Sequence, residues 1–253
     1  MSKILSRREG ILALLKERGA ITVSDIMERF NVSEATVRRD LETLEQDRRL
    51  IRTFGGAVQE SARTEVPFDL KMEINFEEKK EIAEKAYGLI QNGDVICLNG
   101  GTSCLFVARR IARQPFERLT VVTNALNIGC ELAGVPGLEL IMTGGVNRTQ
   151  SFELSGPIAD ATLERLTIRK AFLGTDGIDP EHGLTTFNEL EANTNRMMIR
   201  QSLAAYVLAD HSKFGHRSVY RIDDLQSISA IITDSGTTDE ITSAYAHAGV
   251  RFI

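Results

Sequence analysis

The sequence predicts an α/β protein with two unequal domains, a small helical domain first and a larger domain built around a mostly parallel sheet. The chain has 253 residues, more than one ordinary core of about 100 to 200 residues needs. Apolar residues recur at helical spacing over the first fifty positions. From residue 77 onward, strand-like and helix-like segments alternate to the end.

Composition is that of a globular protein. Hydrophobic residues make up 42 % and charged residues 26 %, and no stretch approaches the roughly 18 uncharged apolar residues that a membrane span needs. The N-terminus carries basic residues but lacks the apolar run and cleavage site of an export signal, so we expect a cytoplasmic protein. The net charge of −5 argues against nonspecific binding of polyanions over the whole surface.

The three cysteines predict neither disulfides nor a zinc site. Cys97, Cys104 and Cys130 form an odd set without paired spacing. Cys97 and Cys130 lie in apolar stretches, which is typical of buried, reduced thiols. We therefore expect no metal and no cofactor.

Two helices are predicted at the N-terminus. Gly19 ends the first, whose apolar stripe consists of Ile4, Ile11, Leu14 and Leu15. Thr22 is the expected N-cap of the second, a short helix whose apolar residues are Val23, Ile26 and Phe30.

A third helix follows a tight connection at residues 31–32. Ser33 can cap this helix, and Thr36 lies in its first turn. The residues expected to face inward are Val37, Leu41 and Leu44. The side chains left to point elsewhere are Glu34, Thr36, Arg38 and Arg39. This arrangement is a helix-turn-helix pattern.

A glycine-containing hairpin is predicted directly after the third helix. Residues 50–53 have the character of a strand, and Gly55 and Gly56 permit a tight turn before Ala57 and Val58 return. Such a hairpin forms the wing of a winged helix-turn-helix domain.

The short second helix, the tight turn, the paired arginines and the wing together predict binding to double-stranded DNA. A recognition helix enters the major groove, where arginine can contact guanine through two hydrogen bonds. The hydroxyls of Ser33 and Thr36 can bind phosphates, and Arg52 can reach the flanking backbone or minor groove. The predicted DNA-contacting residues are Ser33, Glu34, Thr36, Arg38, Arg39 and Arg52. The alternative is an exposed amphipathic helix on which the two arginines pair with Glu34, Asp40 or Glu42.

The stretch TVRRDLETLEQDRRLIRTFGGA, residues 36–57, resembles the signature of the DeoR family of bacterial transcriptional repressors. That signature reads S-x-x-T-[IV]-R-R-D-L-x-x-L-E, followed by leucine or isoleucine, arginine and GGA. The resemblance implies a repressor that binds an operator.

Periodicity is lost over residues 59–76, where Pro67 interrupts an extended-looking stretch, so this segment is the predicted linker. The DNA-binding domain would then span 1–58 and the α/β domain 77–253. A helix is expected over 77–90. The predicted strands are 95–98, 119–122, 138–142, 171–174, 206–209, 230–232 and 250–253.

Small and polar residues follow almost every predicted strand. In an open parallel sheet such loops converge on one edge, where ligands bind. Residues 100–103 lead from a strand into a helix, so their backbone N–H groups can hold an anion such as phosphate. Thr102 and Ser103 add hydroxyl donors. The loop has neither a Walker lysine nor the GxGxxG fingerprint, so a nucleotide is not indicated.

Three residues after later strands can complete such a site. Lys213 can supply a cation for the phosphate, whereas Asp176 and Asp210 can accept hydrogen bonds from sugar hydroxyls. His211 is as consistent with a structural role as with binding.

The family resemblance extends over nearly the whole chain. The DeoR effector domain resembles the fold of ribose phosphate isomerases, and its motifs D-x-G-T-[ST], T-N, G-G and D-H-S-K-[FY] correspond to residues 99–103, 123–124, 144–145 and 210–214. This implies a phosphorylated sugar as effector. Asn99 replaces the usual aspartate, which removes a charge. The predicted effector-binding residues are Asn99, Gly100, Gly101, Thr102, Ser103, Thr123, Asn124, Gly144, Gly145, Asp176, Asp210 and Lys213.

A sugar phosphate isomerase with a DNA-binding appendage is the rival hypothesis. Asp176 and Asp179 resemble the D-G-x-D of the isomerases. Counted without gaps, however, the catalytic glutamate and lysine would fall on Asn195 and Thr186, which cannot do that chemistry. A nonspecific architectural DNA protein fits neither the acidic balance nor the elaborate second domain. We therefore predict a homo-oligomeric repressor of a carbohydrate-metabolism operon rather than an enzyme.

Overall fold

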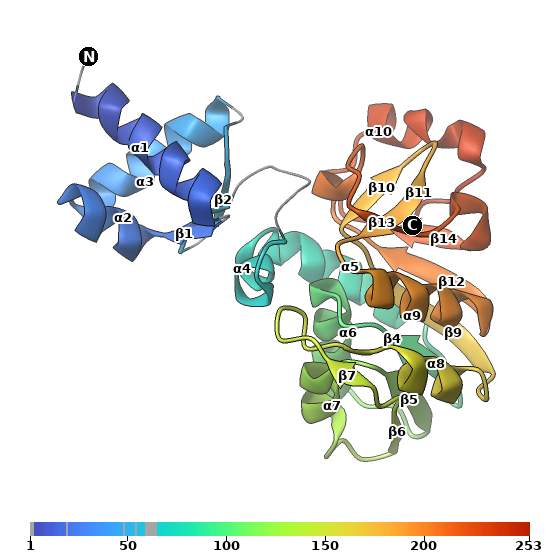
Figure 1. Ribbon diagram of the computed structural model, residues 1–253. Coiled ribbons are helices and arrows are strands. Elements are labelled where there is room, and N and C mark those ends of the chain that lie inside the picture. Colours follow the sequence, from blue (N-terminus) through green and yellow to red (C-terminus); the bar gives the residue numbers. More distant parts are fainter. Residues whose placement is uncertain (1–2, 19, 48, 54, 59–64) are drawn as a thin grey trace. The chain divides into compact units, whose positions relative to one another are not determined.

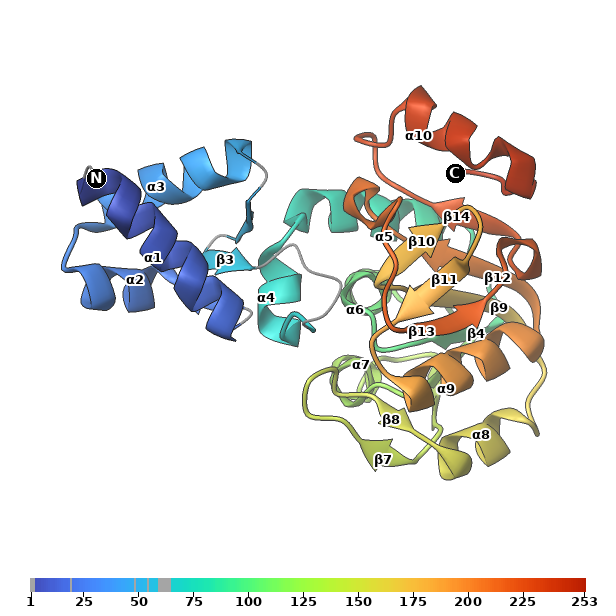
Figure 2. The same ribbon diagram turned by 45° about the horizontal axis from the view of Figure 1, so that its top comes forward.

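The computed structural model describes residues 3–18, 20–47, 49–53, 55–58 and 65–253. It divides into two compact units, Met1–Ile74 and Asn75–Ile253. Figures 1 and 2 show that the first unit is mainly helical, whereas the second surrounds a larger sheet. None of the helices in these residues combines the length and apolar character that a bilayer crossing requires.

Three helices and a small antiparallel sheet form the N-terminal unit. The helices are α1 (Lys3–Arg18), α2 (Val23–Phe30) and α3 (Glu34–Gln46). The strands β1 (Ala20–Thr22), β2 (Ile51–Thr53) and β3 (Gly56–Val58) lie in the order β1-β3-β2. The core that joins them consists of Ile11, Leu15, Ile21, Ile26, Val37, Leu41, Leu44, Leu50 and Ala57. The predicted helix-turn-helix and wing are confirmed.

Local sequence determines both ends of α2. Thr22 Oγ1 accepts a hydrogen bond from the Asp25 N–H at 3.1 Å, and Asp25 Oδ2 accepts one from the Thr22 N–H at 2.9 Å. This reciprocal capping box confirms Thr22 as the N-cap. Asn31 ends the helix in the left-handed conformation, with φ 49° and ψ 55°. Ser33 is at the N-cap position of α3, but its hydroxyl contacts Thr36 Oγ1 at 3.0 Å rather than the helix backbone.

Some details of this unit differ from the sequence prediction. Strand β1 was not predicted. Ile4 is 49 % exposed, because the core packs against the later turns of α1 that carry Ile11 and Leu15. Gly56 is needed less for the turn than for strand packing, since a Cβ there would lie 2.0 Å from the carbonyl oxygen of Ile21 in β1. Gly19, the predicted helix end, lies outside the described residues.

A six-stranded parallel sheet forms the centre of the second unit, in the order β14-β12-β9-β4-β5-β6. Its strands are β4 (Val95–Leu98), β5 (Leu119–Thr123), β6 (Leu138–Met142), β9 (Ile168–Gly174), β12 (Ser202–Leu208) and β14 (Ala230–Ile232). The chain builds outward from β4 to β6 and then returns to β9 on the other side of β4. The strand order therefore reverses between β4 and β9, the position where open parallel sheets bind ligands.

Helices cover both faces of this sheet (Figures 1 and 2). On one face lie α5 (Phe76–Gly88), α6 (Thr102–Arg113) and α7 (Leu126–Leu132). On the other lie α8 (Pro157–Leu163) and α9 (Glu189–Arg200). Buried strand residues such as Cys97, Val122 and Ala171 form the core between them. A further helix, α10 (Asp239–Ala244), and the 3₁₀ turns η1 (His211–Lys213), η2 (Leu225–Ser227) and η3 (Ala246–Ala248) belong to the last part of the chain.

Two small antiparallel sheets were not predicted. One contains β10 (Gly177–Asp179), β11 (Gly183–Thr186) and β13 (Tyr220–Asp223), and the other is the hairpin of β7 (Val146–Asn147) and β8 (Leu154–Ser155). The expected strand at 250–253 is wrong as a full strand. Backbone hydrogen bonds join residues 251–253 to β14 and the residue after it, but they enclose a single bridge pair, Ile231 and Phe252. The segment predicted as a linker contains the short helix α4 (Phe68–Glu73).

Candidate functional site

The outer face of α3 carries the predicted DNA-contacting side chains. Val37, Leu41 and Leu44 are buried, as predicted, whereas Ser33, Glu34, Arg38 and Arg39 are exposed and Thr36 is half-buried. Arg38 forms an ion pair with Glu34 one turn earlier, at 2.7 Å. This is the pairing that the alternative interpretation of the helix proposed for Arg38. No described carboxylate pairs with Arg39, whose guanidinium therefore remains available.

Asp40, the aspartate of the RRD motif, is buried rather than part of this face. Its carboxylate pairs with Arg7 at 2.5 Å and Arg8 at 3.0 Å. Arg8 also donates to Thr43 Oγ1 at 3.0 Å. These contacts tie α1 to α3 and hold the recognition helix in place. The expectation that Asp40 pairs with Arg38 or Arg39 is not met.

Arg52 lies on the wing strand β2 beside the end of α3. Its backbone N–H donates to Glu45 Oε1 at 3.2 Å, and its guanidinium lies 3.5 Å from Glu45 Oε2. The side chain is 30 % exposed. Surface pairs of this kind are weak, so a phosphate can replace the glutamate.

In the second unit, the predicted effector-binding residues lie at one edge of the sheet, because all six strands are parallel and these loops follow their carboxyl ends. Asn99 is at its centre, directly after β4, and is buried. Its Oδ1 accepts hydrogen bonds from the N–H groups of Gly101 and Gly174, at 3.1 and 2.8 Å. Its Nδ2 donates to the Gly174 carbonyl at 3.0 Å and to Asn195 Oδ1 at 3.2 Å.

Both donors of the Asn99 amide are thus used inside the protein. Asn99 holds the loops after β4 and β9 together, and recognition of a ligand hydroxyl by its side chain is not favoured by this geometry. Gly101 and Gly174 also meet directly, since a Cβ on Gly101 would lie 2.8 Å from the Gly174 Cα.

The loop after β4 leads into α6, which begins at Thr102. No described side chain caps this helix. Its first N–H groups therefore face the sheet edge without an intrahelical acceptor. Ser103 is buried and Thr102 half-buried at the same turn. Such a helix start favours an anion.

Thr123 and Asn124 link the loop after β5 to its neighbours. Thr123 Oγ1 donates to the Leu98 carbonyl at 2.8 Å. Asn124 Nδ2 donates to the Leu154 carbonyl at 3.2 Å and lies 3.5 Å from Glu153 Oε2. Asn124 Oδ1 is buried and has no hydrogen-bond partner among the described residues. This amide oxygen is a ready acceptor at the sheet edge.

Gly144 and Gly145 follow β6 and turn the chain into the β7–β8 hairpin. Both have positive φ angles, 72° and 124°, which favour glycine. A Cβ on Gly145 would also lie 2.9 Å from the Ser155 nitrogen in β8. Their role is therefore one of backbone geometry.

Asp176 follows β9 and is half-buried. Its Oδ2 accepts hydrogen bonds from Thr186 Oγ1 at 2.9 Å and from the Phe187 N–H at 3.3 Å. The two positions at which a gapless count placed the isomerase base and lysine, Asn195 and Thr186, thus bind Asn99 and Asp176 instead. They serve as structural partners in this chain.

Asp210 follows β12 and is buried. Its Oδ1 accepts hydrogen bonds from Asn75 Nδ2 at 2.8 Å and from the N–H and hydroxyl of Ser212. Burial alone would raise the pKa of Asp210, but the charge of Lys213, the Ser212 hydrogen bond and the charge of Lys79 lower it. Asp210 is therefore an anion that helps to hold the half-buried Lys213 at the end of the sheet.

Sequence reasoning missed a cluster of buried charged residues at this edge. Glu153 and Glu191 are both buried. Arg148 lies 3.2 Å from Glu191 Oε1, which also accepts a hydrogen bond from Ser151 at 2.5 Å. The residues come from the β7–β8 hairpin and from α9. The pattern of apolar residues gives no signal for them, since a glutamate at a helix start is normally exposed.

His211 has a structural role, because both its ring and its backbone contact Asp234. Its Nδ1 lies 2.8 Å from Asp234 Oδ2, and its backbone N–H donates to Asp234 Oδ1 at 2.7 Å.

Cys97 and Cys104 are buried, and burial raises the pKa of Cys104 to about 12. Cys130, also expected to be buried, is exposed.

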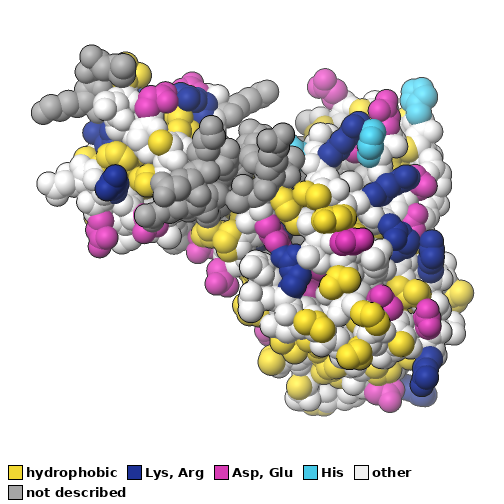
Figure 3. Space-filling view, viewed as in Figure 1, with side chains coloured by type: hydrophobic (Ala, Val, Ile, Leu, Met, Phe, Trp, Pro, Cys, Tyr) yellow, Lys and Arg dark blue, Asp and Glu magenta, His cyan; other side chains and the backbone are white. Residues whose placement is uncertain are grey.

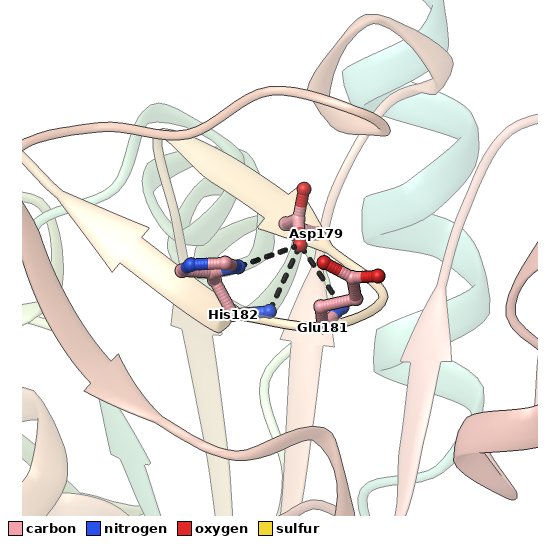
Figure 4. A group of neighbouring side chains, drawn as sticks. All are labelled: Asp179, Glu181 and His182. Carbon is pink, nitrogen blue, oxygen red and sulfur yellow. Dashed lines mark hydrogen bonds and ion pairs between the residues drawn. The ribbon is translucent and has the colours of Figure 1, made fainter.

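A second acidic group lies at the turn between β10 and β11, where Asp179, Glu181 and His182 lie close together (Figure 4). Asp179 Oδ1 accepts hydrogen bonds from the N–H groups of Glu181 and His182, and Oδ2 pairs with Arg217 at 2.6 Å. Burial alone would raise the pKa of Asp179, but these contacts lower it to about 2. The carboxylate closes its own turn, and we assign no metal to it.

The surface of the second unit mixes both signs of charge with apolar side chains on the face that Figure 3 shows. A helix-turn-helix unit with an available arginine is joined to an α/β unit whose sheet has a polar edge at its switch point. This combination defines a DNA-binding protein with a small-molecule sensor domain.

The chain belongs to the DeoR family of transcriptional regulators. Residues 7–63 match the family described as DeoR-like helix-turn-helix domain, and residues 74–235 match the DeoR C terminal sensor domain. The resemblance noted in the sequence is confirmed. The family comprises regulators, so the chain is a transcriptional regulator and not a sugar phosphate isomerase.

Named relatives cover almost the whole chain. It is 35 % identical over 250 residues to the putative aga operon transcriptional repressor of Escherichia coli O157:H7, covering 98 % of this chain and 92 % of the relative. It is 31 % identical over 236 residues to the glycerol-3-phosphate regulon repressor of Escherichia coli strain K12, covering 92 % of each. A solved ribose 5-phosphate isomerase A from Methanocaldococcus jannaschii is 17 % identical over 55 % of each chain, with a TM-score of 0.41. Similarity this low does not bear on activity.

Proposed function

We propose that the chain represses an operon of carbohydrate metabolism in the cytoplasm and leaves its operator when a phosphorylated sugar binds the sheet edge. The observation that carries this proposal is the uncapped start of α6 at the topological switch point. Its free N–H groups suit a phosphate, and Lys213 adds a positive charge at the same edge. The names of the two Escherichia coli relatives, both repressors, support the direction of control.

In this proposal residues 1–58 bind DNA, 59–76 link the domains and 77–253 bind the effector. Arg39 reads a base in the major groove, because it is exposed on α3 and has no described ion-pair partner. Arg38 exchanges Glu34 for DNA, and Arg52 exchanges Glu45 for a flanking phosphate. Ser33 and Thr36 contact the backbone at the start of the helix.

The regulator acts as a homo-oligomer, a dimer or a tetramer. Two copies place two recognition helices on half-sites about 34 Å, or one helical turn, apart. A coupling of about 1 to 3 kcal/mol between the effector and operator sites weakens operator binding roughly 5- to 150-fold, which is enough to end repression.

A screen of promoter fragments from the organism's own chromosome tests this function. We expect the full-length protein to shift a small set of fragments and to release them when the correct sugar phosphate is added. A thermal-shift screen identifies that compound, because an effector at 100 times its dissociation constant stabilises its site by about 2.7 kcal/mol. If no fragment is preferred with or without any sugar phosphate, the proposal is wrong.

A further inference from the structure

Glu153 is a buried carboxyl group at the proposed effector site. It immediately precedes β8 and is 4 % exposed. Its backbone forms a bridge with Ala125, and the next N–H, of Leu154, donates to the Asn124 carbonyl at 2.7 Å. The β7–β8 hairpin is thereby joined to the loop after β5, and the side chain of Glu153 is fixed at the sheet edge.

The two oxygens of this carboxyl group have unequal partners. Oε1 accepts a hydrogen bond from the Gly100 N–H at 2.7 Å, whereas the Asn124 Nδ2 lies 3.5 Å from Oε2, at the limit of a hydrogen bond. Gly100 allows this approach, since a Cβ there would lie 2.2 Å from Glu153 Cγ. Oε2 is therefore the less saturated oxygen.

The groups around Glu153 disfavour its negative charge. Glu191 faces it from α9 and Asp176 from the loop after β9. Cys104, the titratable group on α6, is a neutral thiol, because burial raises its pKa to about 12. The neighbouring cation, Arg148, pairs with Glu191. No described lysine or arginine forms an ion pair with Glu153. Burial first, and then the charges of Glu191 and Asp176, raise the pKa of Glu153 to about 8.

A neutral carboxyl group has a proton to donate. With Oε1 occupied by the Gly100 N–H, that proton belongs on Oε2. The Asn124 Oδ1, buried and without a described partner, belongs to the amide that lies beside Oε2. One donor next to one acceptor is the complement of a hydroxyl group, which both accepts and donates.

We propose that Glu153 contacts the effector in its protonated form, donating from Oε2 to a sugar hydroxyl that in turn donates to Asn124 Oδ1. This inference rests on the proposed function and adds a residue that selects the sugar part of the ligand. A neutral Glu153 also adds no further negative charge near the phosphate of the effector.

Effector affinity should fall as the pH rises, because binding requires the protonated form of Glu153. The complex keeps the proton, whereas the free protein loses it as the pH rises through about 8. Effector affinity is therefore nearly complete at pH 7 and falls about tenfold between pH 7 and pH 9. A phosphate monoester has its second pKa near 6, so the charge of the ligand stays constant over this range.

Calorimetry with defined probes tests the inference. The probes are ribose 5-phosphate, fructose 6-phosphate and glycerol 3-phosphate, each compared with its unphosphorylated parent. For the probe that binds, Glu153→Gln should keep its affinity at pH 7 and lose the tenfold decline, because an amide donates at any pH. Glu77→Gln is the matched control, since the Glu77 side chain is 78 % exposed on α5.

Proton uptake by the unmodified protein gives a second measurement that needs no variant. At pH 8, titrations in two buffers of different ionisation enthalpy should show uptake of about 0.5 proton per bound ligand, because half of Glu153 is ionised there. Zero uptake, or the same pH dependence in Glu153→Gln as in the unmodified protein, overturns the inference while the proposed function stands. If no sugar phosphate binds either protein, the proposed function fails and the inference fails with it.

Discussion

Asn99 illustrates how one side chain can organise the proposed ligand site through contacts inside the protein. Its amide contacts both loops that flank the switch point and uses both of its donors. An aspartate at this position, as in the motif that the sequence resembles, could still accept from the Gly101 and Gly174 N–H groups. It would need Asn195 to present its Nδ2 instead of its Oδ1. The Asn99 side chain therefore complements Asn195, since the Nδ2 of Asn99 donates to the Oδ1 of Asn195.

Arg39→Ala should weaken specific operator binding by about 1 to 3 kcal/mol if Arg39 reads a base. The substitution lies in the N-terminal unit and should leave effector binding unchanged. Fluorescence anisotropy with operator and random duplexes measures the change. Arg113→Ala, an exposed arginine of the sensor unit, is the matched control. Equal operator affinity in both variants would remove Arg39 from the interface.

Lys213→Ala should spare operator binding and blunt the response to the sugar phosphate, because the variant lacks the cation that the phosphate would meet. The concentration of sugar phosphate that releases half of the operator complex measures this effect. A response equal to that of the unmodified protein would place Lys213 outside the effector site.

The sequence predicted which residues lie at the edge of the sheet better than it predicted what their side chains contact. Polar residues after each strand could be assigned to the sheet edge, because strand ends are visible in the apolar pattern. What each side chain contacts could not be predicted, since Asn99, Thr123 and Asp176 bind groups that are distant in sequence. Glu153 was missed for the same reason. Whether a glutamate points inward depends on the loop opposite it, and that loop is known only from the fold.

At the scale of elements, the buried Asp40 couples α1 to the recognition helix. Asp40→Asn should destabilise the N-terminal unit by about 3 kcal/mol, the lower end of the cost of breaking a buried ion pair, because Arg7 and Arg8 still reach solvent. Hydrogen exchange of the α1 and α3 amides in the full chain measures the loss. Asp47→Asn, an exposed change just beyond α3, should have little effect. Equal protection in the two variants would contradict a structural role for Asp40.

Strands rich in apolar residues could be predicted from the sequence, whereas the small strands of the antiparallel sheets could not. The predicted ranges 95–98, 138–142 and 230–232 match β4, β6 and β14 in full. For β4 and β14 the reason is that buried parallel strands appear as continuous apolar runs. The small strands β1, β7, β8 and β10 have two or three residues each. Unlike β14, which also has three residues, they do not consist of a continuous apolar run. The segment 250–253 has a strand-like composition and forms backbone hydrogen bonds with β14, but it ends after a single bridge pair.

At the scale of the whole molecule, the two sites should affect each other equally. If the sugar phosphate weakens operator binding by a given factor, operator DNA must weaken sugar phosphate binding by the same factor. Calorimetric titration of the effector with and without saturating operator DNA measures one factor, and anisotropy measures the other. Unequal factors would show that a further species, such as a change in oligomeric state, takes part.

The contact between Gly101 and Gly174 limits how this sensor can be given a new ligand. Here two backbones touch with no room for a Cβ on either glycine. A mutant library made to build a biosensor for another metabolite should therefore leave both glycines unchanged. Diversity belongs instead at Thr102, Asn124 and Glu153, whose side chains can vary while that backbone junction stays closed.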